Sequence, residues 1–484
     1  MAAKFVRRGA ALAALGIGGA LNLGCLLPDY VEAEGVCGPG TPWVKHFGGL
    51  GVDAVKGAAS DVCGGVTVGG DFQGYISLGL ERGLAGTGET DGYVARLDAA
   101  GNTVWVAQVT GAGDQFVSSL TTDIFGGAIA AGEFTGSLVV PGEDPVTLPG
   151  GQTAVFMRRY GLRGDHHWTR TIREESGAEP TAVCGVAADS AGNVTIAGGF
   201  KGTVDFGGER ETGLFDDNIF VAHYDPEGRL VWVNSYQTKL GIYCNDLAVD
   251  KDGNILLTGS YGSPIDFGEG DHQASGGLDA GKLRVFVLKL SRAGERVWSQ
   301  GTNDWNEQDG LAIEADAEGN VVVAGVFRWR VPLGGEIFDS KGGNDIFVKK
   351  LDPQGLSLWG VTFGDISEDS VGDLAIGPSG DVVIKGETPG TITFDQTLTA
   401  QFVESGAVDP FIATLSGFDG APISSRMFHG PGGEYVKAIA LDPEGWPIVA
   451  GTFPMFIDLG IPSGELKADK NNKGDDFFVT KLKP

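Results

Sequence analysis

The sequence predicts an all-β protein, a seven-bladed β-propeller with four-stranded blades, on three observations. The first is composition, because 81 of the 484 residues are glycine, more than twice the ordinary share of about 7%. The second is a sequence pattern that recurs seven times, at intervals of 61 to 66 residues. The third is that the two ends of the chain carry complementary parts of one repeat. A four-stranded unit repeated seven times is typical of a propeller, whose blades bury their faces against their neighbours.

The first half of each repeat predicts a β-hairpin of two strands, A and B. A glycine is followed by a second glycine six residues later, and Asp stands three residues before the first glycine in six repeats; Gly377 replaces it in the other. In the fourth repeat, Leu247–Asp250 and Ile255–Gly259 are β-rich runs on either side of a turn. The glycine pairs are Gly64/Gly70, Gly126/Gly132, Gly192/Gly198, Gly253/Gly259, Gly319/Gly325, Gly380/Gly386 and Gly445/Gly451.

The second half of each repeat predicts another hairpin, with strands C and D. In the fifth repeat, Phe347–Leu351 and Leu356–Trp359 flank the turn Asp352–Gly355. One large aromatic residue per repeat at a fixed position predicts packing between blades rather than ligand stacking. Ile423 takes the tryptophan position in the sixth repeat, which predicts that this blade is the most weakly packed. The tryptophans at this position are Trp105, Trp168, Trp232, Trp298 and Trp359.

The two ends of the chain predict how the ring closes. Phe478–Leu482 is the strand C of the seventh repeat, and no strand D follows it. Trp43–Phe47 is an orphan D-like strand that precedes the first repeat. We expect the N-terminal strand to complete the last blade and to pair with the C-terminal strand, which removes an exposed edge.

These repeats resemble the bacterial seven-bladed β-propeller repeat family, the SBBP repeat. The matching phrases are Val249–Gly259, Thr203–Gly207 and Asp345–Asp352, and the resemblance covers about residues 43–484. It implies an exported or surface-associated bacterial protein, in a family most of whose members have no assigned activity. It transfers no catalytic residue to this chain.

The N-terminus predicts export. Lys4, Arg7 and Arg8 precede a short apolar run, which is the pattern of a signal peptide. The run ends in a segment that resembles the bacterial lipobox, which implies lipidation of Cys25; Asn22 departs from that motif. Ordinary cleavage, with Cys25 removed or left free, is the alternative. We therefore expect a signal peptide over 1–24, a tether over 25–42 and the propeller over 43–484.

Charge limits the class of partner. The chain has 63 acidic and 35 basic residues, a net charge of −28 and a pI near 4.5, so nucleic acid would be repelled. We expect a monomer that reaches the outer membrane, the periplasm or the cell surface. Its contact with the membrane is expected only through a lipid anchor, and its partner is expected to be an envelope protein or a glycan.

Acidic residues between strand D and the next strand A form a candidate cation site. In the predicted phasing they ring one mouth of the central channel, where carboxylates could hold Ca²⁺ or a cationic ligand. The alternative is that each one binds backbone amides of its own inner strand. The Asp-x-x-Gly turns lack the Glu that closes a calcium loop, so we interpret them as hairpin turns. The mouth residues are Asp53, Asp114, Glu179, Asp309, Asp369 and Glu434.

The connections between strands B and C form a candidate binding rim on the same face as this mouth. Phe327, Trp329, Arg330 and Phe456 lie in these connections. Loops on a rigid scaffold commonly carry recognition. Ordinary loop packing is the alternative for these residues.

The cysteines are consistent with an oxidising compartment. Cys184 and Cys244 stand at nearly equivalent places at the start of strand A in blades three and four, so neighbouring blades could bring them together. Cys37 and Cys63 would form the remaining pair and fix the tether to the ring.

Motifs for catalysis are poor, so the sequence favours a binding or scaffolding role over an enzyme. The six histidines show no metal-ligand spacing, and neither GxSxG nor GxGxxG is present. Two alternatives stay open. One is a polysaccharide hydrolase or lyase that uses two mouth carboxylates as acid and base, and the other is a calcium-stabilised structural surface protein.

Overall fold

The computed structural model describes residues 41–483 with short gaps. The gaps are 176–181, 216, 269, 273–281, 303–306, 334, 395–398, 401–407, 432, 462–463 and 469–473. The predicted signal peptide, Cys25 and Cys37 lie outside the described residues. The described residues form strands and loops, and they contain no helix long and apolar enough to cross a membrane.

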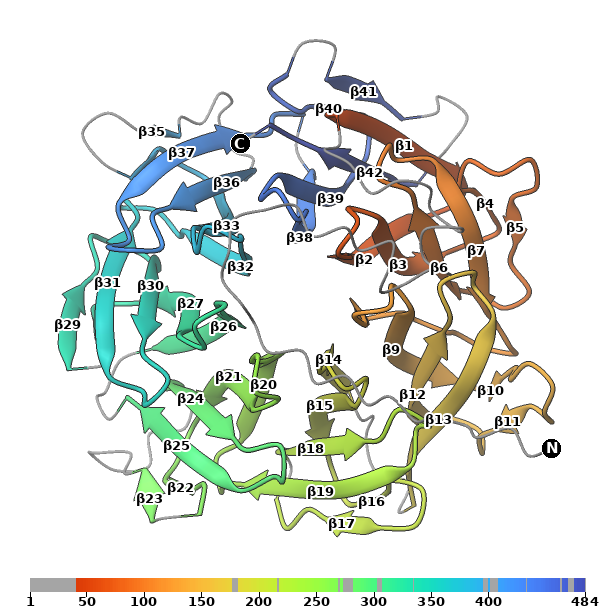
Figure 1. The fold of residues 1–484 in the computed structure, drawn as a ribbon, viewed down its shortest axis with the longest axis horizontal. Helices are drawn as coiled ribbons and strands as arrows, with labels where there is room; N and C mark the ends of the chain where they lie inside the picture. Colours follow the sequence, from red (N-terminus) through yellow and green to blue (C-terminus); the bar gives the residue numbers. More distant parts are fainter. Residues whose placement is uncertain are drawn as a thin grey trace, which may run out of the picture.

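Seven antiparallel blades of four strands each surround a central channel, which confirms the predicted fold class (Figure 1). We number the blades along the chain and name their strands A to D from the channel outwards. The first four blades are β2 (Asp53–Ser60), β3 (Val66–Phe72), β6 (Asp91–Leu97), β7 (Thr103–Val109); β8 (Ser119–Thr122), β9 (Ala128–Thr135), β12 (Thr153–Tyr160), β13 (His166–Glu174); β14 (Ala182–Ala188), β15 (Val194–Phe200), β18 (Asn218–Tyr224), β19 (Leu230–Gln237); and β20 (Ile242–Val249), β21 (Ile255–Tyr261), β24 (Arg284–Leu290), β25 (Arg296–Gly301).

The remaining three blades follow the same order. They are β26 (Gln308–Ala315), β27 (Val321–Phe327), β30 (Asp345–Leu351), β31 (Ser357–Phe363); β32 (Ser370–Ile376), β33 (Val382–Thr388), β36 (Asp409–Leu415), β37 (Pro422–Met427); and β38 (Tyr435–Leu441), β39 (Pro447–Phe453), β42 (Asp476–Lys481), β1 (Trp43–Leu50). Short hairpins lie in the connections between strands B and C: β4 (Tyr75–Ser77) and β5 (Leu84–Ala85), β10 (Ser137–Leu138) and β11 (Val146–Thr147), β16 (Thr203–Asp205) and β17 (Arg210–Thr212), β22 (Ile265–Asp266) and β23 (Asp271–His272), β28 (Arg330–Leu333) and β29 (Glu336–Asp339), β34 (Ile392–Thr393) and β35 (Thr399–Ala400), and β40 (Phe456–Asp458) and β41 (Glu465–Lys467). In two blades the outer strand also pairs with a short hairpin of the next blade, β4–β5 on β1 and β16–β17 on β13.

The ring closes as the sequence predicts. The N-terminal strand β1 is strand D of blade seven and pairs antiparallel with β42, with Trp43 opposite Lys481 and Phe47 opposite Phe477. Figure 1 shows β1, in red, beside the blue β42. The first described strand and the last one therefore hold the ring shut with backbone hydrogen bonds.

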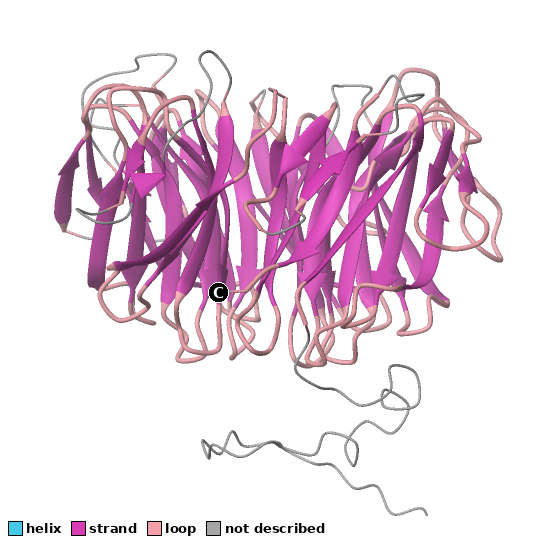
Figure 2. Cartoon of the chain, turned by 90° about the horizontal axis from the view of Figure 1, so that it is seen from above, coloured by secondary structure: helices cyan, strands magenta, loops and turns pink. Residues whose placement is uncertain are grey.

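The two faces of the ring differ in the connections that they carry. Because consecutive strands are antiparallel, the A–B and C–D turns share one face, and the B–C and D–A connections share the other. Figure 2 shows tight turns along one edge of the ring and longer connections along the opposite edge. We call these the turn face and the long-loop face.

The core lies between blades, as the repeated aromatic positions predict. Between blades four and five, for example, Leu256 and Val287 pack with Val323 and Phe347 in one buried cluster. Each tryptophan of strand D also donates its indole N–H to a carbonyl in the C–D turn of the next blade. These bonds are Trp43 to Ala99 (3.0 Å), Trp105 to Leu162 (2.9 Å), Trp168 to Pro226 (3.0 Å), Trp232 to Arg292 (2.9 Å), Trp298 to Pro353 (2.9 Å) and Trp359 to Gly417 (3.2 Å).

Ile423 takes the tryptophan position on a strand whose neighbouring blade has no C–D turn, and the weaker packing of this blade stays a prediction. Its side chain is 52% exposed on β37. The next blade is the seventh, whose strands C and D are the two ends of the chain, β42 and β1. No C–D turn connects these strands, so a tryptophan on β37 would find no turn carbonyl to bind.

The Asp-x-x-Gly segments are hairpin turns, as predicted. In blade four, Asp250 Oδ1 accepts hydrogen bonds from the backbone N–H groups of Asp252 and Asn254, both at 2.9 Å. Its Oδ2 lies 2.8 Å from Nζ of Lys289 on strand C. The same pairing of turn Asp and strand C cation is made by Asp61 with Arg96, Asp123 with Arg159, Asp316 with Lys350 and Asp442 with Lys481.

One predicted disulfide is confirmed. Cys184 on β14 and Cys244 on β20 are bonded, with Cα atoms 5.7 Å apart, and the bond joins the inner strands of blades three and four. Cys63 is also disulfide-bonded. Its predicted partner, Cys37, lies outside the described residues.

Candidate functional site

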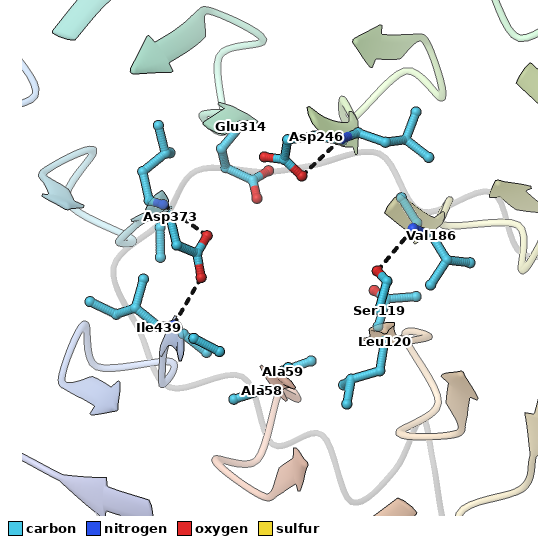
Figure 3. Close-up of a pocket in the computed structure, with 18 of the residues that line it drawn as sticks. Ala58, Ala59, Ser119, Leu120, Val186, Asp246, Glu314, Asp373 and Ile439 are labelled. Carbon is cyan, nitrogen blue, oxygen red and sulfur yellow. Dashed lines mark hydrogen bonds between the residues drawn. The ribbon is translucent and has the colours of Figure 1, made fainter. Parts of the chain in front are cut away.

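The central channel holds a cavity of about 560 Å³, lined by strand A of all seven blades. Its charged side chains are separated by sign. Asp246, Glu314 and Asp373 come from blades four, five and six, whereas Lys56 and Lys437 come from blades one and seven. Figure 3 shows the three carboxyl groups pointing into the opening. Acidic and basic side chains therefore line different sectors of the channel wall.

Two of these carboxylates join neighbouring inner strands. Asp373 Oδ2 accepts a hydrogen bond from the backbone N–H of Ile439 in blade seven at 2.9 Å (Figure 3). Asp246 Oδ2 accepts one from the backbone N–H of Ile313 in blade five at 2.7 Å. Both acids adjoin a β-bulge in strand A, where the ladder of backbone bonds is interrupted. In blade two, Ser119 Oγ accepts from Val186 in the same way, at 3.2 Å.

The acidic side of the channel binds protons near neutral pH. Burial, together with the charge of Asp373, raises the pKa of Asp246 well above its usual range. Burial raises the pKa of Glu314 to about 7, and the charge of Asp373 adds to this effect. Burial also raises the pKa of Asp373 to about 6, against the opposing charge of Lys385. The channel therefore carries less negative charge at neutral pH than its composition implies.

Our sequence analysis missed these channel acids, although the repeat contains a signal for them. Ser119, Asp246 and Asp373 each stand four residues before the turn position of their own repeat. The other repeats have Gly or Ala at this place. Aligning the repeats on the turn would therefore have shown these three residues, whereas Glu314 stands only two residues before its turn position.

The predicted mouth acids do not converge on the channel, which corrects the expected ring. Asp53 is the first residue of β2, Asp369 and Glu434 stand one residue before β32 and β38, and all three are buried. Asp114 and Asp309 are displaced by one residue, since Gln115 and Gln308 pair with Phe134 and Phe327 as Asp53 pairs with Phe72. One residue along a strand turns a side chain to the opposite face. Glu179 lies outside the described residues.

The individual contacts of these acids favour local roles. Asp369 Oδ2 accepts a hydrogen bond from the backbone N–H of Asp365 at 2.9 Å. Asp309 Oδ1 accepts one from the Asn245 side chain at 2.6 Å, and burial raises the pKa of Asp309 to about 6. Within the described residues, no group of three or more His, Cys, Asp and Glu side chains is arranged to hold a metal. A calcium site at the mouth stays a prediction.

The predicted rim includes one residue that does not belong to it. Phe327 is fully buried at the end of β27, with its ring 6.3 Å from that of Phe347. It occupies an aromatic position of strand B that also holds Phe72, Phe134 and Phe200. The sequence signal was an aromatic residue two places after the second glycine of the repeat, which marks core rather than rim.

The other rim residues are exposed on the long-loop face. The Trp329 side chain is 69% exposed, and Phe456 is also exposed. Arg330 Nε lies 2.8 Å from Asp339 Oδ1 within the hairpin β28–β29. Trp329 has φ +73°, a positive value that no other non-glycine residue of the described chain shows and that is unfavourable for a bulky side chain.

The backbone around Trp329 holds it in this strained conformation. Its N–H donates to Ser340 Oγ at 2.9 Å, and its carbonyl accepts from the backbone N–H of Ser340 at 2.9 Å. On its other side, Arg328 forms an ion pair with Glu368, which lies in the D–A connection to blade six. Strain that is held by surrounding contacts is common at binding sites. The indole is thus presented to solvent by a hairpin that is fixed at both ends.

Comparisons with known proteins match only parts of the chain at low identity. No family model matches it. It is 24% identical over 113 residues to an uncharacterized WD repeat-containing protein of Acanthamoeba polyphaga mimivirus, which covers 23% of this chain and 8% of that protein. It is 27% identical over 152 residues to the regulatory protein FlaEY of Caulobacter vibrioides, which covers 30% of this chain and 16% of that protein. The matched segments are a small part of either relative.

Two solved structures are similar to the chain at low TM-scores. One is a protein of unknown function from Bacteroides caccae, with a TM-score of 0.33 and 10% identity, covering 66% of this chain and 94% of that one. The other is Sqt1 from Chaetomium thermophilum, with a TM-score of 0.41 and 14% identity, covering 91% of this chain and all of that one.

Proposed function

We propose that this protein is an exported binding or scaffolding protein of the cell envelope, which recognises its partner with the long-loop face. The observation that carries the proposal is Trp329, a largely exposed indole in a strained backbone conformation. Trp and Arg are the residues most enriched at binding hot spots. Ile366, Met455 and Phe456 are further exposed apolar side chains in connections of this face.

The fold supports such a role because it holds these connections on a closed ring. Every blade packs on two neighbours, and the pairing of β1 with β42 leaves no open end. Loops on such a scaffold have little freedom to lose when a partner binds. The partner in this proposal is an envelope protein or a glycan.

Two features support export as part of the proposal. Lys4, Arg7 and Arg8 before an apolar run have the pattern of a signal peptide. The bond between Cys184 and Cys244 is of a kind that persists in oxidising compartments. A lipid on Cys25 would anchor the ring to a membrane. Incorporation of labelled palmitate that is lost in Cys25→Ala tests this anchor.

The binding face is tested with a pair of matched variants of the mature protein. Trp329→Asn removes the indole and keeps a residue that tolerates positive φ. Phe418→Asn removes a ring that is 91% exposed in a C–D turn on the opposite face. Each variant and the wild type are used to capture partners from an envelope extract and from envelope glycans.

We expect Trp329→Asn to weaken capture by at least about tenfold, the effect of one hot-spot side chain, and Phe418→Asn to leave it unchanged. Equal capture by all three proteins would contradict the assignment of the long-loop face. Loss of capture in Phe418→Asn alone would assign binding to the turn face instead.

A further inference from the structure

The seam between blades seven and one buries a carboxyl group that has no hydrogen-bond partner. Asp53 begins β2, is 0% exposed, and neither of its side-chain oxygens is hydrogen-bonded. Its backbone N–H donates to the carbonyl of Asp475 at 3.1 Å, which fixes it beside the start of β42. A buried ionised carboxylate without partners is strongly unfavourable, so the Asp53 carboxyl group requires either a bound proton or a nearby cation.

The charged groups around Asp53 do not supply a cation for it. From blade seven, Asp476 faces it, and Asp476 Oδ2 lies 2.8 Å from Nε2 of His46 on β1. From its own blade, Asp71 on β3 faces it, with Lys56 Nζ 3.8 Å from Asp71 Oδ1. Each of the two bases is thus placed beside a different carboxylate.

These surroundings favour the protonated form of Asp53. Burial raises the pKa of Asp53 to about 7, and the negative charges of Asp476 and Asp71 add to this effect. The backbone of Gly49 acts in the opposite direction and lowers the pKa. The neighbouring Asp476 has Nε2 of His46 2.8 Å from its Oδ2. One proton between the two carboxyl groups therefore removes the repulsion across the seam.

The same arrangement recurs between blades five and six. Asp369 donates its backbone N–H to the carbonyl of Asn344 at 2.8 Å, which places Asp369 beside Asp345 at the start of β30. Both side chains are buried, and Oδ1 of each has no hydrogen-bond partner. Burial and the charge of Asp369 raise the pKa of Asp345.

The seam between blades six and seven also places two buried acids at these positions, Asp409 and Glu434, but other seams do not. Between blades four and five the residues are Arg284 and Gln308, and between blades three and four they are Asn218 and Ile242. The acidic pair is therefore a feature of particular seams and not a requirement of the repeat.

We propose that a proton shared between Asp53 on β2 and Asp476 on β42 stabilises the contact between blades one and seven, so that ring closure depends on pH. The protonated carboxyl of Asp53 donates its O–H to the ionised carboxyl of Asp476. As the pH rises, the proton passes to solvent and leaves two carboxylates facing each other in a buried seam. A proton fits better than a metal ion, because the described residues here supply no third acidic or histidine ligand in suitable geometry.

The sign of the pH dependence follows from the raised pKa. The folded protein binds this proton more tightly than the unfolded chain, whose Asp53 carboxyl has a pKa near the ordinary value of 3.8. The stabilisation is complete below that value and is lost as the pH rises through about 7. This seam is thus weaker at pH 8 than at pH 5.

The test compares the mature wild type with Asp53→Asn, which cannot titrate and keeps a donor toward Asp476. Thermal unfolding is followed from pH 5 to 8, and hydrogen exchange is measured by segment at both limits. At pH 8 we expect the variant to melt at a higher temperature than the wild type. We expect exchange in Trp43–Leu50 to be at least about tenfold slower in the variant, with Ser357–Phe363 as the unchanged reference segment.

Three results would overturn the proposal. One is an identical dependence of the melting temperature on pH in both proteins. Another is a change in exchange that is equal in Trp43–Leu50 and Ser357–Phe363, because it would show no local effect at the closing seam. The third is a calcium-dependent rise in melting temperature at pH 8 in the wild type alone, reversed by chelator, because a cation would then occupy the pair.

Discussion

Replacement of Gly164 by alanine tests whether contacts on the turn face hold neighbouring blades together. Gly164 lies in the C–D turn of blade two with φ +82°, and a Cβ atom there would lie 2.8 Å from Cδ2 of Trp105 in blade one. The Trp105 indole is buried against this turn and donates its N–H to the Leu162 carbonyl at 2.9 Å. The added methyl group therefore displaces the indole from its site.

The expected loss of stability has three parts. The left-handed conformation costs an alanine about 1–2 kcal/mol. Loss of the indole hydrogen bond costs about 1 kcal/mol, and partial exposure of the ring costs about another 1 kcal/mol out of the 1.5–3 kcal/mol typical of a large buried side chain. Together these parts predict a loss of about 3–4 kcal/mol in the free energy of unfolding.

Gly380→Ala is the matched control. Gly380 lies in the A–B turn of blade six with the same φ of +82°, but no atom lies within 4 Å of an added Cβ. This variant has the backbone cost alone, so it should be more stable than Gly164→Ala by about 2 kcal/mol. Urea unfolding followed by tryptophan fluorescence measures the difference. Equal midpoints would refute the reasoning, since they would show that the indole contact contributes nothing.

Two further predictions concern other links between strands and blades. Arg96→Met leaves Asp61 buried without its cation and should cost about 3–5 kcal/mol. Arg229→Met removes an exposed pair with Asp225 and should leave the urea midpoint nearly unchanged, because solvent screens such a pair. Similar urea midpoints for the two variants would contradict this. Replacement of Cys184 and Cys244 by serine opens a cross-link of sequence separation 60 and should cost about 4 kcal/mol by loop entropy. Because Cys63 is also disulfide-bonded, the comparison is made with reductant present and absent: the double variant should melt lower than the oxidised wild type and at the same temperature as the wild type when both are reduced. An unchanged melting temperature of the oxidised double variant would refute the contribution of the bond.

The fold could be predicted because every repeat carries the same local signals. Turn residues, β-rich runs and one aromatic position recur at nearly constant spacing. The strands predicted in one repeat are therefore supported by the same pattern in the other repeats. The ring closure was predictable for the same reason, since Trp43–Phe47 and Phe478–Leu482 are the two halves of one repeat. The bond between Cys184 and Cys244 followed from equivalent positions in adjacent blades.

The site was harder to predict because it depends on strand register. We placed the mouth acids by counting forward from the strand D tryptophan, across D–A connections of variable length. Counting back eight residues from the turn position gives the equivalent residues of the inner strands, and the first three of them pair with Phe72, Phe134 and Phe327. These residues are Asp53, Gln115, Gln308, Asp369 and Glu434. Asp114 and Asp309 fall one residue away, and that single step separates a side chain in the seam from one on the other face.

Blade six shows why the exceptions to the repeat occur together. In most blades a turn Asp and a strand C cation form a buried pair, but blade six has Gly377 and Thr414 at these two places. Loss of one partner alone would leave a buried charge unpaired, at a cost of about 3–5 kcal/mol, and blade six lacks both. Blade three has His223 at the strand C position, and its Asp189 pairs instead with Arg292 of blade four at 3.2 Å. Ile423 of blade six also lacks the partner that a tryptophan would have at this position, because the neighbouring blade has no C–D turn to accept an indole N–H. The irregular residues of this blade are therefore the ones whose interaction partners are absent.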